Sequence, residues 1–368
     1  MVAPPFPFDL DLFCQVIDHF GDAGVALRLA RALAGKPEVG RVRLFCSDLP
    51  LLRRLAGAGE DAVALASWTE GAQASPAPVI VAAFGCDLPE PYLTRAKASA
   101  RLVLHLDYLS AEPWVIGMHG LPSPYPDSPL PRFFFMQSFL PGAGGVLGTR
   151  PERAPRPTSP DSPLRVLYYV YGDFDGRPLL AALDARGQPW VVVAPAGEGQ
   201  RALTGQLEAG GFARAGRVWR RGRGRVVCPP FLDQRRFDRL IAWADVPLVR
   251  GEDSPVQAIL AGRALAWQLY RQPLETRGAK LEAFLYAASG FFPGDEARDV
   301  FADFHRWLNG TGTAGPGGAE GLCTRFLAQR EAIAAAMSDW GRALATRCNL
   351  PDSMVYFMCQ YLRGESPP

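Results

Sequence analysis

The chain has 368 residues, of which 48% are hydrophobic and 21% charged, and its formal net charge at pH 7 is +2. This length predicts two domains of similar size, and the near-neutral charge gives no reason to expect nucleic acid or an anionic membrane as a partner. No apolar run is long enough for a membrane span, and the N-terminus lacks the basic and continuous apolar regions of a signal peptide. The seven cysteines form no CxxC pair and the four histidines are far apart, which favours a cytoplasmic protein with reduced thiols over disulfides or a zinc site.

The first half alternates short apolar runs with helical patterns. Strands are predicted at 11–17, 41–46, 79–84, 101–106 and 132–136. Their nearly continuous apolar character is typical of parallel strands that are covered on both faces. Within 22–34, the apolar residues Val25, Leu29 and Leu33 have helical spacing, and Gly35 is suited to end that helix.

The same alternation restarts after a stretch at 141–163 that is crowded with glycine and proline, which predicts a linker or a long surface excursion. Strands are predicted at 164–170, 190–194, 225–228, 246–250 and 264–269, and the last hundred residues are mainly helical. We therefore expect two doubly wound α/β domains facing each other across a cleft. The predicted parts are an N-terminal domain at 1–145, a linker at 146–163, a C-terminal domain at 164–348, and a helix at 349–368 that packs back on the first domain.

Two aspartates follow the first predicted strand. Open parallel sheets bind ligands beyond the carboxyl ends of their strands, but this loop has no GxGxxG pattern and Asp22 would repel a pyrophosphate. One interpretation is that Asp22 caps the helix and Asp18 is a turn residue. The other is that the two carboxylates receive a cation or an acidic proton, while Gly21 and Gly24 let the backbone turn tightly.

A second candidate is the segment "VPLVRGEDSP", where an apolar strand runs directly into a helix. Pro255 suits the first turn of that helix, and Asp253 or Ser254 suits its cap. The free N–H groups of a helix N-terminus can hold a diphosphate, which leaves Glu252 to accept hydrogen bonds from sugar or ribose hydroxyls. The alternative is an ordinary capped helix.

Aromatic residues follow other strands of the second half. Tyr169, Tyr171 and Phe231 suit stacking on a base, and Gln234 can offer its amide to a pyrimidine edge; the alternative is that the rings are simply packed. In the first half, Asp107 and Glu112 could line an acceptor surface or be loop residues without a chemical role.

Several stretches together resemble one family. The segments "FCQVIDHFGDAGVALRLAR", "FGCDLPE", "LDYLSAE", "LPSP", "PPFLDQRRFD" and "RGEDSPVQAILAGRALAWQLYRQ" are similar to the bacterial EarP proteins. The resemblance implies a GT-B-type glycosyltransferase that moves L-rhamnose from dTDP-β-L-rhamnose to an arginine of elongation factor P, with inversion and without a metal or other cofactor. The partners it implies are that protein and that donor, with no nucleic acid and no membrane.

The resemblance also implies roles for individual residues. Asp22 corresponds to a general base and Asp18 to the acidic neighbour that helps to hold the acceptor arginine. The implied donor-binding residues are Tyr169, Tyr171, Phe231, Gln234, Glu252, Asp253, Ser254 and Tyr270, and Asp107 and Glu112 are candidates for acceptor binding. The sequence departs from the family pattern at His19, Tyr169, Val170 and Pro255, where we expect Asn, Phe, Gly and Phe.

This identification explains the two aspartates. A planar guanidinium fits carboxylates in bidentate fashion. Its pKa exceeds that of an aspartate by about 8 units, or roughly 11 kcal/mol, so proton transfer must accompany formation of the C–N bond. A helix N-terminus lowers the pKa of Asp22 and the charge of Asp18 raises it, and the sequence leaves the balance open. No DxD motif stands where a metal would be needed, and backbone amides of the RGEDS helix can replace it.

Two other functions remain compatible with the sequence. One is a GT-B-type nucleotide-sugar enzyme with another acceptor, or an epimerase. The other is a non-catalytic binding protein of the same fold, although the presence of both Asp22 and Glu252 disfavours it.

Overall fold

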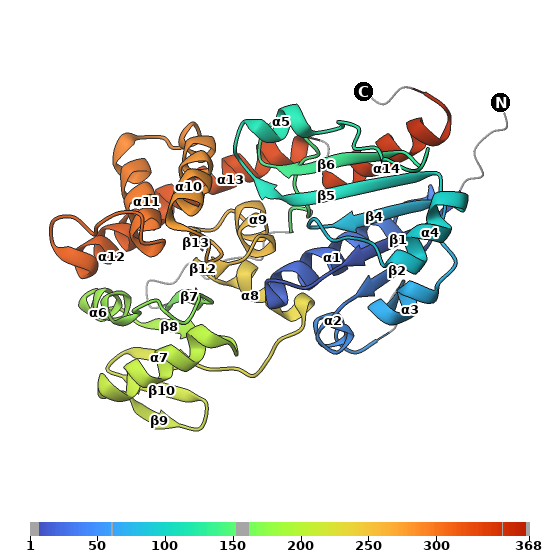
Figure 1. The fold of residues 1–368 in the computed structure, drawn as a ribbon. Helices are drawn as coiled ribbons and strands as arrows, with labels where there is room; N and C mark the ends of the chain where they lie inside the picture. The colour runs from blue at the N-terminus through green and yellow to red at the C-terminus, as the bar shows by residue number, and fades with distance from the viewer. Residues whose placement is uncertain (1–6, 60–61, 152–161, 348, 366–368) are drawn as a thin grey trace. The chain divides into compact units, whose positions relative to one another are not determined.

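Two mainly parallel β-sheets organise the chain, one in each of two units (Figure 1). The computed structural model describes residues 7–59, 62–151, 162–347 and 349–365. Unit 1 comprises Met1–Gly148 together with Thr346–Pro368, and unit 2 comprises Thr149–Ala345. Most of the predicted linker, at 152–161, lies outside the described residues.

Unit 1 contains a six-stranded parallel sheet with the order β3-β2-β1-β4-β5-β6. Its strands are β1 (Phe8–Cys14), β2 (Val39–Cys46), β3 (Val63–Ser67), β4 (Val79–Ala83), β5 (Leu102–Ser110) and β6 (Arg132–Ser138). The first strand ends at Cys14 rather than at 17, because Gln15 and Ile17 are already exposed. Strand β3 was not predicted, since only Val63 of its five residues is buried.

Helices flank this sheet (Figure 1). They are α1 (His19–Ala34), α2 (Leu49–Ala56), α3 (Trp68–Gln73), α4 (Glu90–Ser99), α5 (Trp114–Met118) and α14 (Leu350–Leu362). The C-terminal helix α14 packs against α1 and β5. Its Phe357 ring lies edge-on to Phe133, with 5.2 Å between the centroids, and the Leu350 N–H donates to the carbonyl of Val146 at 3.0 Å.

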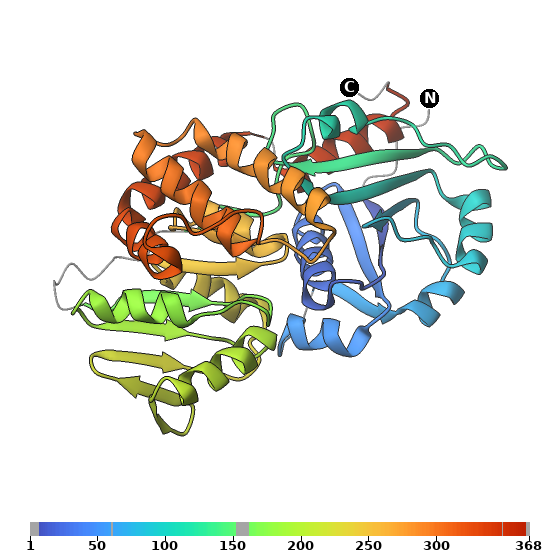
Figure 2. The same cartoon turned by 60° about the vertical axis from the view of Figure 1, so that its left-hand side comes forward.

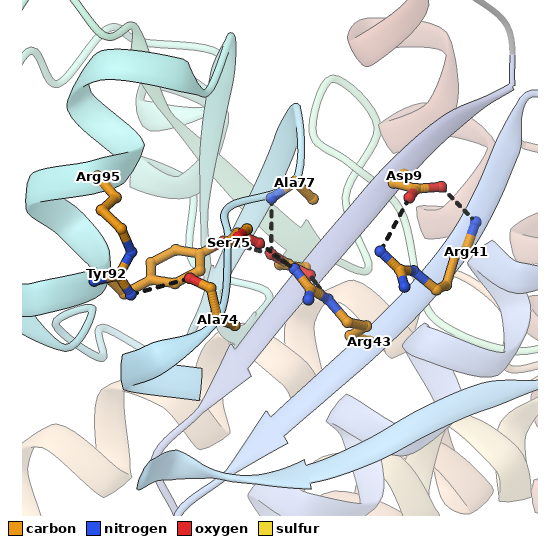
Figure 3. A network of polar contacts seen from close by, with 9 residues as sticks. Asp9, Arg41, Arg43, Ala74, Ser75, Ala77, Tyr92 and Arg95 are labelled. Carbon is orange, nitrogen blue, oxygen red and sulfur yellow. Dashed lines mark hydrogen bonds and ion pairs between the residues drawn. The ribbon is translucent and has the colours of Figure 1, made fainter. Parts of the chain in front are cut away.

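A buried polar network holds β1, β2 and the segment before β4 together (Figure 3). Asp11, fully buried in the middle of β1, accepts from Arg43 Nε at 2.6 Å, Tyr92 Oη at 2.5 Å and the Ala77 N–H at 2.9 Å. A buried charge needs such partners, because burying it alone is costly. The "DLD" stretch at 9–11 therefore has a structural role, and Asp9 next to it pairs with Arg41.

Unit 2 contains a seven-stranded sheet with the order β13-β12-β7-β8-β11-β10-β9. Its strands are β7 (Leu164–Tyr168), β8 (Trp190–Val193), β9 (Ala213–Ala215), β10 (Val218–Arg221), β11 (Gly224–Val227), β12 (Val246–Arg250) and β13 (Ala266–Gln268). Strand β10 runs antiparallel to both of its neighbours, β11 and β9. The sequence does not predict β9 and β10, because this segment is rich in arginine and mostly exposed.

The helices of unit 2 are α6 (Arg177–Ala185), α7 (Glu198–Ala209), α8 (Gln234–Trp243), α9 (Asp253–Leu260), α10 (Leu274–Ser289), α11 (Asp295–Leu308), α12 (Gly318–Ala328) and α13 (Arg330–Thr346). Helix α11 covers the outer edge of β13 (Figures 1 and 2). Buried His305 accepts the Trp267 N–H at Nε2 (3.0 Å), and Asn309 accepts the Leu269 N–H at 2.8 Å. The two side chains thus supply hydrogen-bond acceptors to backbone N–H groups that a neighbouring strand would otherwise bind at this edge of the sheet.

Candidate active site

The acidic loop after β1 places Asp22 inside the first turn of α1. The helix begins at His19 with Asp18 at the N-cap position, so the interpretation of Asp22 as the N-cap is wrong. Asp22 is 3% exposed, and its Oδ2 accepts the N–H groups of Ile17 at 2.7 Å and Asp18 at 2.9 Å. Both side-chain hydrogen bonds that the described residues give Asp22 go to Oδ2.

Burial decides the pKa of Asp22. Desolvation raises the pKa above its ordinary value of 3.8, and the two backbone hydrogen bonds from Ile17 and Asp18 oppose this only in part. Burial deprives the ionised carboxylate of solvation by water, and the two neutral N–H donors replace only part of that stabilisation. Asp22 is therefore a stronger base than a solvated aspartate.

Asp18 lies directly over the first turn of the helix. A Cβ atom added to Gly21 would stand 2.7 Å from Asp18 Oδ2, and the Gly21 N–H donates to the Asp18 carbonyl at 2.6 Å. Glycine is thus required here for close approach, as the sequence predicts. The side chain of the neighbouring His19 lies outside the described residues.

The loop after β4 is strained. Phe84 is the only non-glycine residue with positive φ (59°) among the described residues. Its buried ring stacks on Tyr108 with 4.9 Å between the centroids. Such a conformation costs of order 1–3 kcal/mol and is common at functional sites. Since β4 pairs with β1, this loop and the acidic loop follow neighbouring strands. Apart from the Phe-Gly pair at 84–85, nothing in the sequence indicates this strained conformation.

Asp107 and Glu112 both make local contacts. Asp107 lies in β5 and its Oδ1 accepts the N–H of Tyr108 at 2.7 Å. Glu112 turns back onto Ser110, whose hydroxyl donates to Glu112 Oε2 at 2.9 Å. Asp107 lies near the carboxyl end of β5 and Glu112 just beyond it, at the same edge of the sheet as Asp18 and Asp22, but their contacts are to residues one or two positions away in sequence.

In unit 2, two tyrosines of the loop after β7 lie against Arg250, a residue that the sequence motifs do not single out for a role. Arg250 ends β12 and is 9% exposed; its guanidinium carbon lies 4.9 Å from the ring centroid of Tyr169 and 4.5 Å from that of Tyr171. Tyr171 also approaches Tyr270, with 6.1 Å between ring centroids. Cation–π contacts of this kind are favourable when partly desolvated. The structure therefore brings three of the predicted donor residues together.

The departures Val170 and Pro255 are both buried. Phe231 and Gln234 follow β11, with Gln234 as the first residue of α8. Helix α8 follows β11 and helix α9 follows β12, and these two strands run in the same direction. The two helices also pack against each other.

The RGEDS segment forms the start of α9. The N-cap is Glu252, without a side-chain capping bond, so the prediction of Asp253 or Ser254 as the cap is wrong. Asp253 instead accepts from Gln257 Nε2 at 3.0 Å. Glu252 is not left to a ligand alone, because Lys280 Nζ lies 2.6 Å from its Oε1. Lys280 had not been singled out either.

The described residues contain no group of three or more His, Cys, Asp or Glu side chains that could hold a metal ion. Over the same residues, no helix is long and apolar enough to cross a membrane.

The two sheets, with candidate ligand residues at the carboxyl ends of their strands, define a protein of the GT-B fold class. The calicheamicin glycosyltransferase CalG4 shares this fold, with a TM-score of 0.51 and 16% identity over 100% of both chains. A solved structure concerned with EarP-mediated arginine glycosylation of translation elongation factor EF-P aligns with a TM-score of 0.63 and 23% identity, over 95% of this chain and 98% of that one. At these identities the likeness shows the fold alone.

The sequence itself matches more specifically. The model of the family described as "Elongation-Factor P (EF-P) rhamnosyltransferase EarP" matches residues 10–359. A protein-arginine rhamnosyltransferase of Pseudomonas putida is 35% identical over 305 residues, which cover 75% of this chain and 80% of the relative. The chain therefore belongs to the EarP family of protein-arginine rhamnosyltransferases, which confirms the resemblance found in the sequence motifs.

Proposed function

We propose that the chain transfers L-rhamnose from dTDP-β-L-rhamnose to an arginine side chain of elongation factor P, with inversion at the anomeric carbon and without a metal. The observation that carries the proposal is the acidic loop: a buried carboxylate with a raised pKa, Asp22, beside a second carboxylate, Asp18. This pair suits a cationic acceptor. Because that acceptor is a translation factor, the proposed reaction takes place in the cytoplasm.

In unit 1, Asp18 and Asp22 would hold the guanidinium and fix its plane through charge-assisted hydrogen bonds. Asp22 Oδ2 is already bound by two backbone N–H groups, so Oδ1 would take the proton. Prior deprotonation would cost roughly 11 kcal/mol from the ordinary pKa values, and the raised pKa of Asp22 narrows that gap. The proton leaves nitrogen as the C–N bond forms and the C–O bond to the diphosphate breaks.

In unit 2, the donor would bind at the start of α9. Its backbone N–H groups and partial positive charge would hold the diphosphate and stabilise the departing dTDP. Glu252, Asp253 and Ser254 would contact the donor. The aromatic and amide side chains proposed to contact its base or sugar are Tyr169, Tyr171, Phe231, Gln234 and Tyr270. Asp107 and Glu112 remain candidates for acceptor contacts. A single in-line displacement inverts the anomeric centre.

Intact-mass analysis tests the proposal directly. Purified elongation factor P is incubated with this protein and dTDP-rhamnose, and the expected result is the added mass of one rhamnosyl group, which peptide fragmentation then assigns to an arginine. A donor that binds while elongation factor P stays unmodified would indicate a GT-B-type enzyme with another acceptor. Interconversion of the nucleotide sugar without an acceptor would indicate an epimerase.

A further inference from the structure

The most buried lysine–carboxylate ion pair in the described part of the chain joins α10 to the start of α9. Lys280 Nζ lies 2.6 Å from Glu252 Oε1, and the side chains are 15% and 18% exposed. The chain has only three lysines. The other two, Lys36 and Lys97, pair with aspartates that are 45% and 67% exposed. Solvent screens exposed ion pairs more than partly buried ones. Of the three lysines, Lys280 is therefore the one whose loss should change the energy of its carboxylate partner most.

The position of the pair gives it a chemical consequence. Glu252 occupies the N-cap of α9, where the positive end of the helix dipole favours an anion. A carboxylate without a counter-ion at that position would repel an incoming diphosphate. An ammonium group at 2.6 Å cancels the charge and fixes the direction of the side chain.

We propose that Lys280 is a positioning residue for the nucleotide-sugar donor, acting through Glu252. It neutralises Glu252 so that the start of α9 accepts a diphosphate, and it holds the carboxylate in one orientation toward the donor. This inference rests on the proposed function, in which α9 binds the donor. It goes beyond it by assigning a role to a residue 28 positions away in sequence.

A double-mutant cycle measured by calorimetry tests the inference. The probes are dTDP and dTDP-rhamnose, and the proteins are wild type, Lys280→Met, Glu252→Gln and the double variant. Lys280→Met should weaken binding of both probes by at least about tenfold, because it removes the ammonium group that neutralises a partly buried carboxylate beside the diphosphate. Adding Glu252→Gln removes that charge, so the double variant should bind dTDP within a few fold of Glu252→Gln alone. Lys280→Arg, which keeps the charge, should restore most of the affinity.

The matched control is Lys97→Met, which breaks a lysine–aspartate pair of 2.7 Å in unit 1 and should leave both affinities unchanged. If Lys280→Met binds both probes like this control, the pair is only structural and the inference is overturned. Additive losses in the double variant would also overturn it, since Lys280 would then not act through Glu252. Unchanged dTDP-rhamnose affinity in Glu252→Gln would refute the donor assignment itself, which is a different result. Lys280→Gln serves in the same cycle if Lys280→Met does not fold.

Discussion

Replacing Gly21 with alanine separates the stability of α1 from the position of Asp18. The added methyl group would stand 2.7 Å from Asp18 Oδ2 and 3.3 Å from its carboxyl carbon. The carboxylate must therefore move by several tenths of an ångström. Because it is the end of a half-buried side chain, it can do so without unfolding the loop. Alanine in a helical turn otherwise stabilises by up to about 1 kcal/mol relative to glycine.

We therefore expect Gly21→Ala to keep or raise the unfolding temperature while lowering transfer. A misplacement of about 1 Å in a group that orients a substrate can cost ~10²-fold in rate. The assay is single-turnover rhamnosylation of elongation factor P beside thermal unfolding. Gly205→Ala is the matched control, since that glycine lies within helix α7 and an added Cβ meets nothing within 4 Å; it should gain stability and keep full activity. Wild-type turnover in Gly21→Ala would refute the placement of Asp18 on the acceptor.

Three further outcomes follow from the same contacts. Burial lowers the pKa of His305 from 6.5 to about 4. Between these pH values the unfolded chain binds a proton that the native chain does not. The free energy of unfolding should therefore fall by on the order of 3 kcal/mol as the pH drops from about 6.5 toward 4. Urea unfolding across that range measures it, and an equally steep loss in His305→Gln would contradict the assignment. The raised pKa of Asp22 should place the acid limb of the rate profile above that of a solvated carboxylate, with kcat/KM falling as Asp22 is protonated; a limb at or below pH 3.8 would argue against it. Rhamnosylation should survive exhaustive EDTA treatment, and activity that is lost with EDTA and restored by Mg²⁺ or Mn²⁺ would overturn the metal-free mechanism.

The sequence predicts the strands that are buried on both faces, because their apolar residues are nearly continuous. Strands such as β12, whose five residues are all buried, were placed correctly. The sequence does not predict the short strands β9 and β10, because backbone hydrogen bonds between the strands hold them in the sheet and few of their side chains are buried.

The position of the candidate residues in the fold is predictable where topology alone decides it. Asp18 and Asp22 follow a strand, and parallel strands end at one edge of their sheet. The environment of each side chain was not predictable. The burial of Asp22 depends on where α1 begins, and the contact of Glu252 with Lys280 depends on how α10 packs, which no sequence spacing encodes.

We propose that Asp22 acts as the base on the acceptor arginine and takes no part in holding the donor. The most direct test measures the rate of rhamnosyl transfer and the dTDP-rhamnose affinity of Asp22→Asn. Asp9→Asn is the control, since Asp9 lies near the start of β1, the strand that precedes the acidic loop, and pairs with Arg41. A general base contributes ~10²–10⁴ in rate, so Asp22→Asn should lose at least that factor while donor affinity stays near wild type and Asp9→Asn remains active. Near wild-type transfer by Asp22→Asn, or a loss of donor affinity that accounts for the lost rate, would contradict the account.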